Sequence, residues 1–440
     1  MISPKKLLLV TLPVTAAFLL PVQSHATNGY FSHGTSVAEK GLAGAGVAYS
    51  QDTLSASNNP AGMVWQGGAW DIGAALFAPI RSYTVTNPPS GLGPFPLAPG
   101  SYESDNELFL IPQFGYNWAL NEKSTIGISV YGNGGMNTEY PSSLYPSGTS
   151  APPCSPGTFY CGTTGVNFEQ LFISTTYSRK FSDSASWGIS GIVAYQRFSA
   201  TGVNNFAGSS NDPANLSDNG TDTATGFGVR LGVQAEVAKG LTLGAAYQPK
   251  INMGEFDDYA GLFAEKGGFD IPSNWTLGLA WHVSDNNVFL FDIQQIDYTD
   301  VGSVSNSIAN LSSMCMTGPP DAGCLGGSNG AGFGWQDMTI YKLGYEWASS
   351  DAWTWRVGYS LTDQPIPTTE MTFNVLAPGV IEQHFTFGFT RSYSNNSDFN
   401  VAVMYAPNVK VSGPNSFDPN QNIDLEMYQY ELAFSYSKHF

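Results

Sequence analysis

Four cysteines are the residues of this 440-residue sequence with the most defined chemistry, and they occur as two close pairs. Cys154 lies near Cys161, and Cys315 lies near Cys324. Neither spacing matches the Cys and His patterns of zinc sites, so we expect no metal. In an exported chain, close cysteine pairs form local disulfides. The sequence therefore predicts the disulfides Cys154–Cys161 and Cys315–Cys324.

Catalytic motifs are missing from the sequence. It contains no GxSxG nucleophile elbow, no HExxH zinc-protease motif and no P-loop. The five histidines are scattered, and no Ser, His and carboxylate set can be assembled in a consistent register. We therefore expect neither an enzyme nor a cofactor.

Apolar side chains stand out in a stretch whose composition is otherwise that of a loop. Phe256, Tyr259, Leu262 and Phe263 fall in or beside DDYAGLFAEKGGF (257–269), which has the spacing of a short amphipathic helix. Apolar side chains in a loop either bind a ligand or pack on one another. We predict that these four residues grip a hydrophobic ligand, and packing of loop on loop is the alternative.

Composition excludes one class of partner and favours one class of protein. The chain has 17 Lys and Arg against 35 Asp and Glu, so its surface repels phosphate backbones and we expect no nucleic-acid partner. Only 12% of the residues are charged, whereas 13% are aromatic and 49 are Gly. A disordered chain would have few aromatics, and this balance fits a membrane barrel better than a soluble enzyme.

The N-terminus has the composition of a signal peptide. Lys5 and Lys6 precede the apolar run LLLVTLPVTAAFLLPV, and Ser24-His25-Ala26 resembles a cleavage site. Residues 1–26 are therefore expected to be removed on export. No run of about 18 apolar residues follows, so a membrane-spanning chain would have to form a closed β-barrel.

Strict alternation of apolar and polar residues dominates the rest of the chain. In the last segment Tyr430, Leu432 and Phe434 share one face, while Glu431 and Ser435 share the other. One face suits lipid and the other suits a lumen, which predicts an all-β fold, a transmembrane antiparallel β-barrel of 14 strands. The strands are expected at 68–86, 107–119, 124–138, 166–181, 185–199, 222–238, 241–253, 270–284, 287–300, 335–348, 351–362, 381–393, 397–410 and 424–440.

The connections between these strands alternate between short and long. Short periplasmic turns and long external loops give this rhythm in outer-membrane barrels. Both cysteine pairs fall in long connections, so the disulfides are expected to pin external loops. The long connections are 87–106, 139–165, 200–221, 254–269, 301–334, 363–380 and 411–423.

Alternation also directs several ionisable side chains into the lumen. Isolated buried charges are costly, so these groups are expected to pair or to contact water or another segment. An arginine among them could hold a carboxylate. The set is Arg230, Glu236, Lys342, Glu346, Arg356, His384 and Glu431.

Residues 27–67 show no strand alternation and are too few to bury a core of their own. Ser36 and Glu39 have the spacing of a capping box, and Asn59 followed by Pro60 suits the start of a helix. The segment is therefore predicted to form a hatch in the lumen of a barrel built from residues 68–440.

Glycines interrupt the strand expected at 124–138. Three of the four residues Gly132, Asn133, Gly134 and Gly135 lack a side chain, which predicts a bulge or kink. A frayed strand end before a long loop is the alternative.

Eight motifs in order resemble the FadL/TodX family of outer-membrane transporters of long-chain fatty acids and hydrocarbons. The resemblance covers nearly the whole chain after the signal. The motifs are NGYFSHG (28–34), KGLAGAGVAYSQD (40–52), NNPAGM (58–63), SVYGNGGMNTEYP (129–141), FDIQQIDYTDVGSV (291–304), GWQDMTIYKLGYEW (334–347), RVGYSLTDQPIP (356–367) and NVLAPGVIEQHFTFG (374–388).

The resemblance implies a hatch and a lateral exit. Family members take ligands into an apolar pocket, and a kink in the third strand opens the wall, which would fall at Gly132–Gly135. Arg197 matches a region near the ligand in the family, although alternation faces it outward. The hatch motif of the family matches Asn58, Asn59, Pro60 and Ala61, either as a rigid cap or as a mobile latch.

Passive transport of hydrophobic compounds across the bacterial outer membrane is the predicted function. The expected partners are fatty acids, alkanes or aromatic hydrocarbons, together with outer-membrane lipid and lipopolysaccharide, and the family suggests a monomer. A general diffusion porin for polar solutes is the alternative, although an open pore has no use for a hatch. An adhesin or structural barrel is a further alternative.

Overall fold

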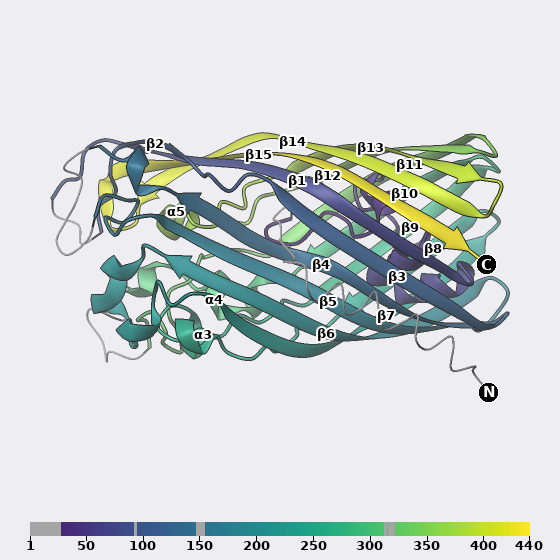
Figure 1. Ribbon diagram of the computed structural model, residues 1–440, viewed down its shortest axis with the longest axis horizontal. Coiled ribbons are helices and arrows are strands. Elements are labelled where there is room, and N and C mark those ends of the chain that lie inside the picture. The colour runs from purple at the N-terminus through teal and green to yellow at the C-terminus, as the bar shows by residue number, and fades with distance from the viewer. Residues whose placement is uncertain (1–27, 92–94, 147–154, 312–314, 316–321) are drawn as a thin grey trace.

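The computed structural model describes residues 28–440 except 92–94, 147–154, 312–314 and 316–321. The strands form one antiparallel sheet that closes on itself where β15 pairs with β1 (Figure 1). β2 (Gly100–Glu103) is a short addition to β1, so 14 strands make the wall. They are β1 (Ala69–Thr86), β3 (Phe109–Asn121), β4 (Ser124–Tyr140), β5 (Thr164–Lys180), β6 (Ala185–Thr201), β7 (Asp222–Ala238), β8 (Leu241–Gln248), β9 (Asn274–Ser284), β10 (Asn287–Ile296), β11 (Met338–Ser350), β12 (Trp353–Thr362), β13 (Gln383–Tyr393), β14 (Ser397–Asn415) and β15 (Asp418–His439).

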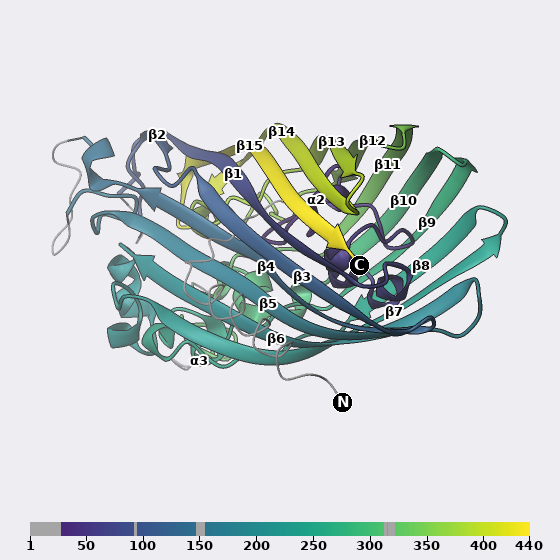
Figure 2. The ribbon, with the colours of Figure 1, turned by 45° about the vertical axis from the view of Figure 1, so that its right-hand side comes forward.

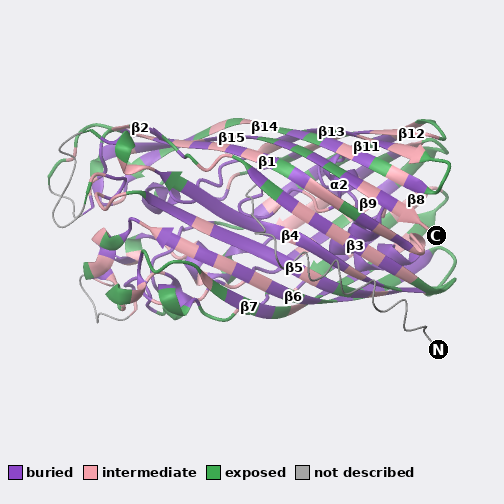
Figure 3. Cartoon of the chain, in the orientation of Figure 1, coloured by how far each residue is buried: buried purple, intermediate pink, exposed green. Residues whose placement is uncertain are grey.

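Alternation along each strand separates a lumen face from an outer face. Figure 3 shows the bands of buried and exposed residues that result. In β15, for example, Leu432 and Phe434 are exposed, whereas Glu431 and Ala433 are buried. An apolar outer surface over a polar interior is the arrangement of a barrel in a lipid bilayer. The predicted fold class and strand number are therefore confirmed.

The last hairpin corrects one predicted loop. Residues 411–423 were expected to form a long external connection, but β14 runs to Asn415 and β15 begins at Asp418. Gly413 and Pro414 are of residue types that favour turns, yet both belong to the ladder, where Pro414 stands opposite Asn422. The register shifts between Pro414 and Asn415, and such an irregularity accommodates proline in a strand.

Short helices occur only outside the wall in the described part of the chain, and none of them is long and apolar enough to span a membrane. Three belong to residues 28–67, which we call the N-terminal segment: α2 (Val37–Lys40), η1 (Thr53–Ser57) and η2 (Pro60–Trp65). The others lie in the long connections and are η3 (Ser142–Leu144), η4 (Asn204–Ser209), η5 (Pro213–Asn215), η6 (Asp257–Tyr259), α3 (Ala264–Gly267), η7 (Tyr298–Asp300), α4 (Gly302–Ser305) and α5 (Met371–Asn374).

The N-terminal segment lies within the ring of strands (Figure 2). None of its residues is exposed, and its backbone bonds to lumen-facing side chains of several strands. Gly46 and Val47 donate to Asp292 of β10 at 2.8 and 3.0 Å, and Thr53 donates to Asp71 of β1 at 2.9 Å. The segment therefore makes specific polar contacts with strands on different sides of the ring. The predicted signal peptide, residues 1–26, falls outside the described residues.

Candidate functional site

An apolar cavity of about 40 Å³ lies at the end of the barrel that carries the long connections. Four connections and the lumen faces of β4, β5 and β6 converge on it. None of the described lining residues is charged. They are Met136, Val166, Phe198, Ala200, Val203, Phe206, Leu262, Phe263, Ser303, Leu325, Ala331, Gly332, Phe333, Phe373 and Leu376.

The residues predicted to grip a ligand divide into two groups. Leu262 and Phe263 line the cavity. Phe256 and Tyr259 do not, but their rings stand 5.6 and 4.8 Å from the ring of Phe198, which does line it. Phe256 and Tyr259 are fully buried and support the cavity wall from behind.

The amphipathic helix expected at 257–269 does not form. The stretch contains the 3-10 turn η6 and the four-residue α3, in which Glu265 and Lys266 have φ values of 57° and 65°. Gly267 follows with φ of 100°, and a Cβ there would meet the carbonyl oxygen of Phe256 at 2.4 Å. Three consecutive left-handed residues turn the chain back on itself and prevent a continuous helix.

Arg197 lies on the outer face of β6 and is not among the cavity-lining residues. Its guanidinium pairs with Glu169 of β5 at 3.3 Å, directly across the ladder. Alternation predicted this outward direction correctly. A role for Arg197 in holding ligand inside the cavity is not supported by its position.

Several lining residues were missed by sequence analysis, above all Phe206, Phe333 and Phe373. They come from three different connections, and Phe206 and Phe373 pack edge to face at 5.2 Å. Each is one aromatic in an irregular stretch, so only their convergence in space reveals a site. A surplus of apolar residues in the long connections was the one available signal.

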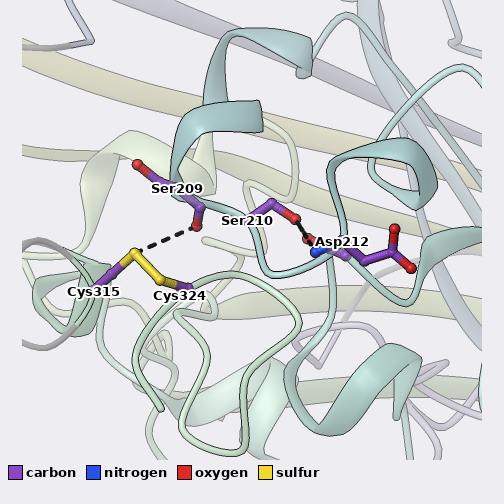
Figure 4. The surroundings of a disulfide bond; sticks show 6 residues. Ser209, Ser210, Asp212, Cys315 and Cys324 are labelled. Atoms are coloured by element: carbon purple, nitrogen blue, oxygen red, sulfur yellow. Dashed lines mark hydrogen bonds between the residues drawn. A yellow bond between two sulfur atoms is a disulfide. The ribbon is translucent and has the colours of Figure 1, made fainter. Parts of the chain in front are cut away.

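A disulfide restrains one of the connections that form the cavity. Cys315 and Cys324 are bonded, as predicted, next to Ser209 of a neighbouring connection (Figure 4). Leu325, beside Cys324, lines the cavity and donates its N–H to the carbonyl of Ser209 at 3.0 Å. The predicted partner of Cys161, Cys154, falls outside the described residues.

An aromatic cluster surrounds Tyr30 near the start of the N-terminal segment. The Tyr30 side chain is fully buried, and the backbone N–H of Tyr30 donates to the Tyr298 hydroxyl at 3.1 Å. The Tyr298 hydroxyl donates in turn to the carbonyl of Asn28 at 2.5 Å. The cluster consists of Tyr30, Phe168, Phe269, Tyr298 and Trp335, with ring centroids 5.1 to 6.0 Å from Tyr30.

The wall of the barrel is incomplete beside β4. The ladder between β3 and β4 begins at Phe114 and Val130, so residues 131–140 of β4 pair only with β5 in the described ladders. The β4–β5 register shifts between Gly132 and Gly134, which makes Asn133 the extra residue of a bulge. Pro112, which has no N–H to donate, lies in the part of β3 that pairs with β1 but has no ladder to β4.

The N-terminal segment bonds to this bulge from the lumen side. Ser32 donates to the carbonyl of Asn133 at 3.1 Å, and Gly135 donates to the carbonyl of Tyr30 at 2.8 Å. A Cβ on Gly134 would meet the Tyr30 carbonyl oxygen at 2.0 Å, so glycine is needed for this approach. Backbone groups without partners are costly in lipid, and these bonds satisfy some of those that the missing ladder leaves.

The NNPA residues tie the N-terminal segment together and to the wall. The Asn59 side chain accepts from Ala61 N–H at 3.0 Å and donates to the carbonyls of Val47 and Val233 at 2.6 and 3.1 Å. Pro60 begins η2, as the sequence predicted. Asn58 differs from Asn59, because its side chain borders a second, polar cavity.

Most of the predicted lumen-facing ionisable side chains are buried and have polar partners. Arg356 pairs with Glu346 at 2.7 Å, and Glu431 pairs with Lys40 of the N-terminal segment at 2.8 Å. His384 shares a hydrogen bond with Ser360 at 2.9 Å. Glu236 is the exception, since it is exposed near the end of β7. Breaking a buried pair such as Lys40–Glu431 costs about 3–5 kcal/mol.

Two carboxyl groups of the N-terminal segment have raised pKa values. Burial, reinforced by the nearby Asp52 carboxylate, raises the pKa of Glu39 to about 8. Burial and the neighbouring Asp71 raise the pKa of Asp52 to about 7. Both shifts favour the neutral, protonated form of the carboxyl group while the segment is packed inside the barrel.

Raising the pH from about 5 to about 8 will therefore lower the stability of the folded protein. Across this window folded Glu39 holds a proton that the unfolded chain, with an ordinary pKa of 4.5, has released. Glu39→Gln keeps a hydrogen-bonding carbonyl but cannot ionise, so its pH dependence will be flatter. Calorimetric unfolding midpoints of both proteins across this range check the prediction, and identical slopes would contradict it.

Comparisons with solved structures bear on the fold. The Pseudomonas putida toluene transporter TodX matches with a TM-score of 0.65 at 18% identity, over 94% of this chain and 100% of that one. The Ralstonia pickettii toluene transporter TbuX matches with a TM-score of 0.63 at 16% identity, over 93% and 99%. A Pseudomonas aeruginosa FadL homologue gives 0.64 at 16% identity, over 93% and 98%. At such identities these likenesses show the fold alone.

Sequence comparison bears on the family. Comparison with curated proteins gave no match. A sequence model described as "Outer membrane protein transport protein (OMPP1/FadL/TodX)" matches residues 22–436, nearly the whole chain. Together with the closed barrel, this match shows that the chain belongs to the OMPP1/FadL/TodX family of outer membrane transport proteins.

Proposed function

We propose that the protein carries neutral hydrophobic compounds passively across the outer membrane. The observation that carries this proposal is the apolar cavity, whose described lining holds no charged side chain. A neutral ligand gains about 0.8 kcal/mol for each buried CH₂ group in such a site. A carboxylate would have to leave water there without a counter-charge, which is costly.

Two similar structures support the choice of ligand class. TodX and TbuX are described as toluene transporters, and both share the fold. Five phenylalanines line the cavity of the present protein: Phe198, Phe206, Phe263, Phe333 and Phe373. Aromatic rings pack well on one another in offset or edge-to-face geometry, so a small aromatic hydrocarbon suits this lining.

The N-terminal segment is proposed to act as a hatch between the cavity and the wall. Tyr30 belongs to the aromatic cluster, and both Tyr30 and Ser32 bond to the backbone of the β4 bulge. A shift of residues 30–32 would uncover the unpaired edge of β4. The ligand would then leave sideways into the outer leaflet instead of crossing the polar interior below.

Filling the cavity tests this proposal. Ala331 lines the cavity and is buried, so Ala331→Phe places a ring in the space left for ligand. The expected result is loss of toluene binding and of toluene uptake, with normal amounts of folded barrel. Ala214→Leu changes an exposed alanine of another connection and will leave both unchanged. Undiminished uptake by Ala331→Phe would refute this cavity as the binding site.

A further inference from the structure

The opening between β3 and β4, which we call the seam, is fastened at both of its ends. It lies between residues 109–113 of β3 and residues 131–138 of β4. Towards the short turns, the ladder between the two strands begins at the pair Phe114–Val130. β2 lies at the opposite end of the barrel, with the long connections (Figure 1). The residues that follow β2, 104–106, reach from β1 across to β4, and we call them the crosspiece.

Three hydrogen bonds fasten the crosspiece to a single residue of β4. The N–H of Asp105 donates to the carbonyl of Glu139 at 2.8 Å. The N–H of Glu139 donates to the Ser104 hydroxyl at 3.0 Å, and the Asn106 side chain donates to the Glu139 carboxylate at 3.3 Å. The crosspiece therefore takes the place that a ladder with β3 would have at this point of β4.

Arg81 of β1 holds the other side of the crosspiece. Its carbonyl accepts from the N–H of Ser104 at 2.9 Å, and its guanidinium donates to the carbonyl of Asn106. The guanidinium carbon also lies 5.7 Å from the ring centroid of Phe109, the first residue of β3. Arg81 is only 4% exposed, so its charge depends on these protein contacts in place of water. The crosspiece is thus bonded to strands on both sides of the seam.

The middle of the seam is closed more loosely than its ends. A cavity of about 10 Å³ lies there, lined by β3, β4 and the N-terminal segment. A Cβ on Gly132 would meet the Cγ2 of Ile111 at 3.1 Å, so the Ile111 side chain fills part of the space that the missing ladder leaves. The buried Nε2 of Gln113, which also lines this cavity, has no hydrogen-bond partner among the described residues. The seam can therefore part in its middle more easily than at its ends.

We propose that the crosspiece limits the thickness of the hydrocarbons that leave through the seam. This rests on the proposed function, because it concerns the lateral exit. The unpaired stretch of β4 is about 26 Å long at about 3.3 Å per residue. Its strands are fastened at both ends, and β3 stays paired with β1 and β4 with β5, so they can bow apart only slightly.

A narrow opening of this kind selects ligands by shape. A flat aromatic ring needs only about 3.5–4.0 Å between the atoms on its two sides and the wall, so it passes edge-on. A rigid hydrocarbon cage such as adamantane has no thin direction and must force the strands further apart. With the crosspiece released, the outer end of the seam would splay and admit the cage.

Uptake of toluene and of adamantane by cells that produce the protein tests the proposal. The double substitution Ser104→Ala and Asp105→Pro removes the hydroxyl and the N–H that bond to the Glu139 backbone. It will raise adamantane uptake at least about fivefold, the factor that the net contribution of one hydrogen bond gives, and will leave toluene uptake unchanged. Arg81→Met releases the crosspiece from the β1 side and will act in the same direction. Heat-modifiable migration on gels shows that both variants are folded.

A neighbouring pair of residues gives the matched control. Thr84 of β1 and Ser101 of β2 share an exposed hydrogen bond at 2.8 Å that does not involve the crosspiece. The double substitution Thr84→Ala and Ser101→Ala will leave the uptake of both compounds unchanged. In detergent, adamantane will bind the original protein and the crosspiece variants equally, because the apolar cavity is intact in all of them.

Three results would overturn the proposal. Adamantane uptake that stays at the original level in both folded variants would show that the crosspiece sets no limit. Adamantane uptake as fast as toluene uptake in the original protein would show that no such limit exists. Failure of the original protein to bind adamantane in detergent would place the limit in the apolar cavity. If the original protein fails to take up toluene, the proposed function fails instead.

Discussion

Deletion of residues 29–63 will convert the protein from a closed barrel to one that conducts ions steadily. In planar bilayers the full protein will show little conductance, whereas the deletion variant will show large, stable steps. The physical reason is that the N-terminal segment lies inside the ring of strands and none of its described residues is exposed. Conductance at the level of the full protein would refute the hatch.

The barrel itself will survive this deletion. β1 pairs with β15 over the whole span from Ala69 to Thr86, and no residue of the N-terminal segment takes part in that closure. The lumen charges that lose partners, such as Glu431, would face water instead of protein and would regain solvation. Heat-modifiable migration on gels gives the check that the variant is folded.

Two asparagines provide a graded control. Asn59→Ala removes three hydrogen bonds that hold the segment to itself and to β7, so it will produce intermittent openings. Asn58→Ala alters the neighbouring residue, which borders the second, polar cavity, and will leave conductance low. Equal behaviour of the two variants would contradict the clamp role assigned here to Asn59.

The wall of the barrel was predictable because each strand is recognised from the pattern of residues adjacent in the sequence. Alternation has a period of two, and each strand needs one face for lipid and one for the lumen. The expected strand at 185–199, for example, is observed at Ala185–Thr201. Errors arose where glycine and proline occur within the sheet, as at Gly413 and Pro414, because pairing with a neighbouring strand outweighed their turn preference.

The candidate site was predictable only in part, because it depends on contacts between distant segments. Leu262 and Phe263 could be selected from their own surroundings, whereas Phe333 and Phe373 meet them only after the connections fold together. Glycines at lumen-facing strand positions could also have indicated where another segment packs against the wall. A Cβ on Gly232 would meet the Asn59 side chain at 2.0 Å, and one on Gly244 would meet the Val47 carbonyl at 2.2 Å. Such positions mark where a second chain layer approaches the wall.

Deletion of Asn133 alone is expected to stop hydrocarbon uptake while the barrel folds normally. Asn133 is the extra residue between the pairs Gly132–Leu171 and Gly134–Gln170, so its removal restores a regular β4–β5 ladder. The straightened strand loses the Asn133 carbonyl that accepts from Ser32, and its edge can approach β3. The proposed lateral exit would then be closed, and ligand would remain in the apolar cavity.

The matching control removes a bulge elsewhere in the wall. The β14–β15 register shifts between Ala406 and Val409, far along the sheet from β4, and deletion of Asn408 regularises it in the same way. Both deletion variants will bind toluene in detergent, but only the Asn133 deletion will fail to transport it in cells. If the Asn133 deletion variant binds toluene but does not transport it, the defect lies in ligand exit and not in ligand capture. Full transport by the Asn133 deletion would exclude the β4 bulge as the exit, and loss of binding would indicate damage to the cavity itself.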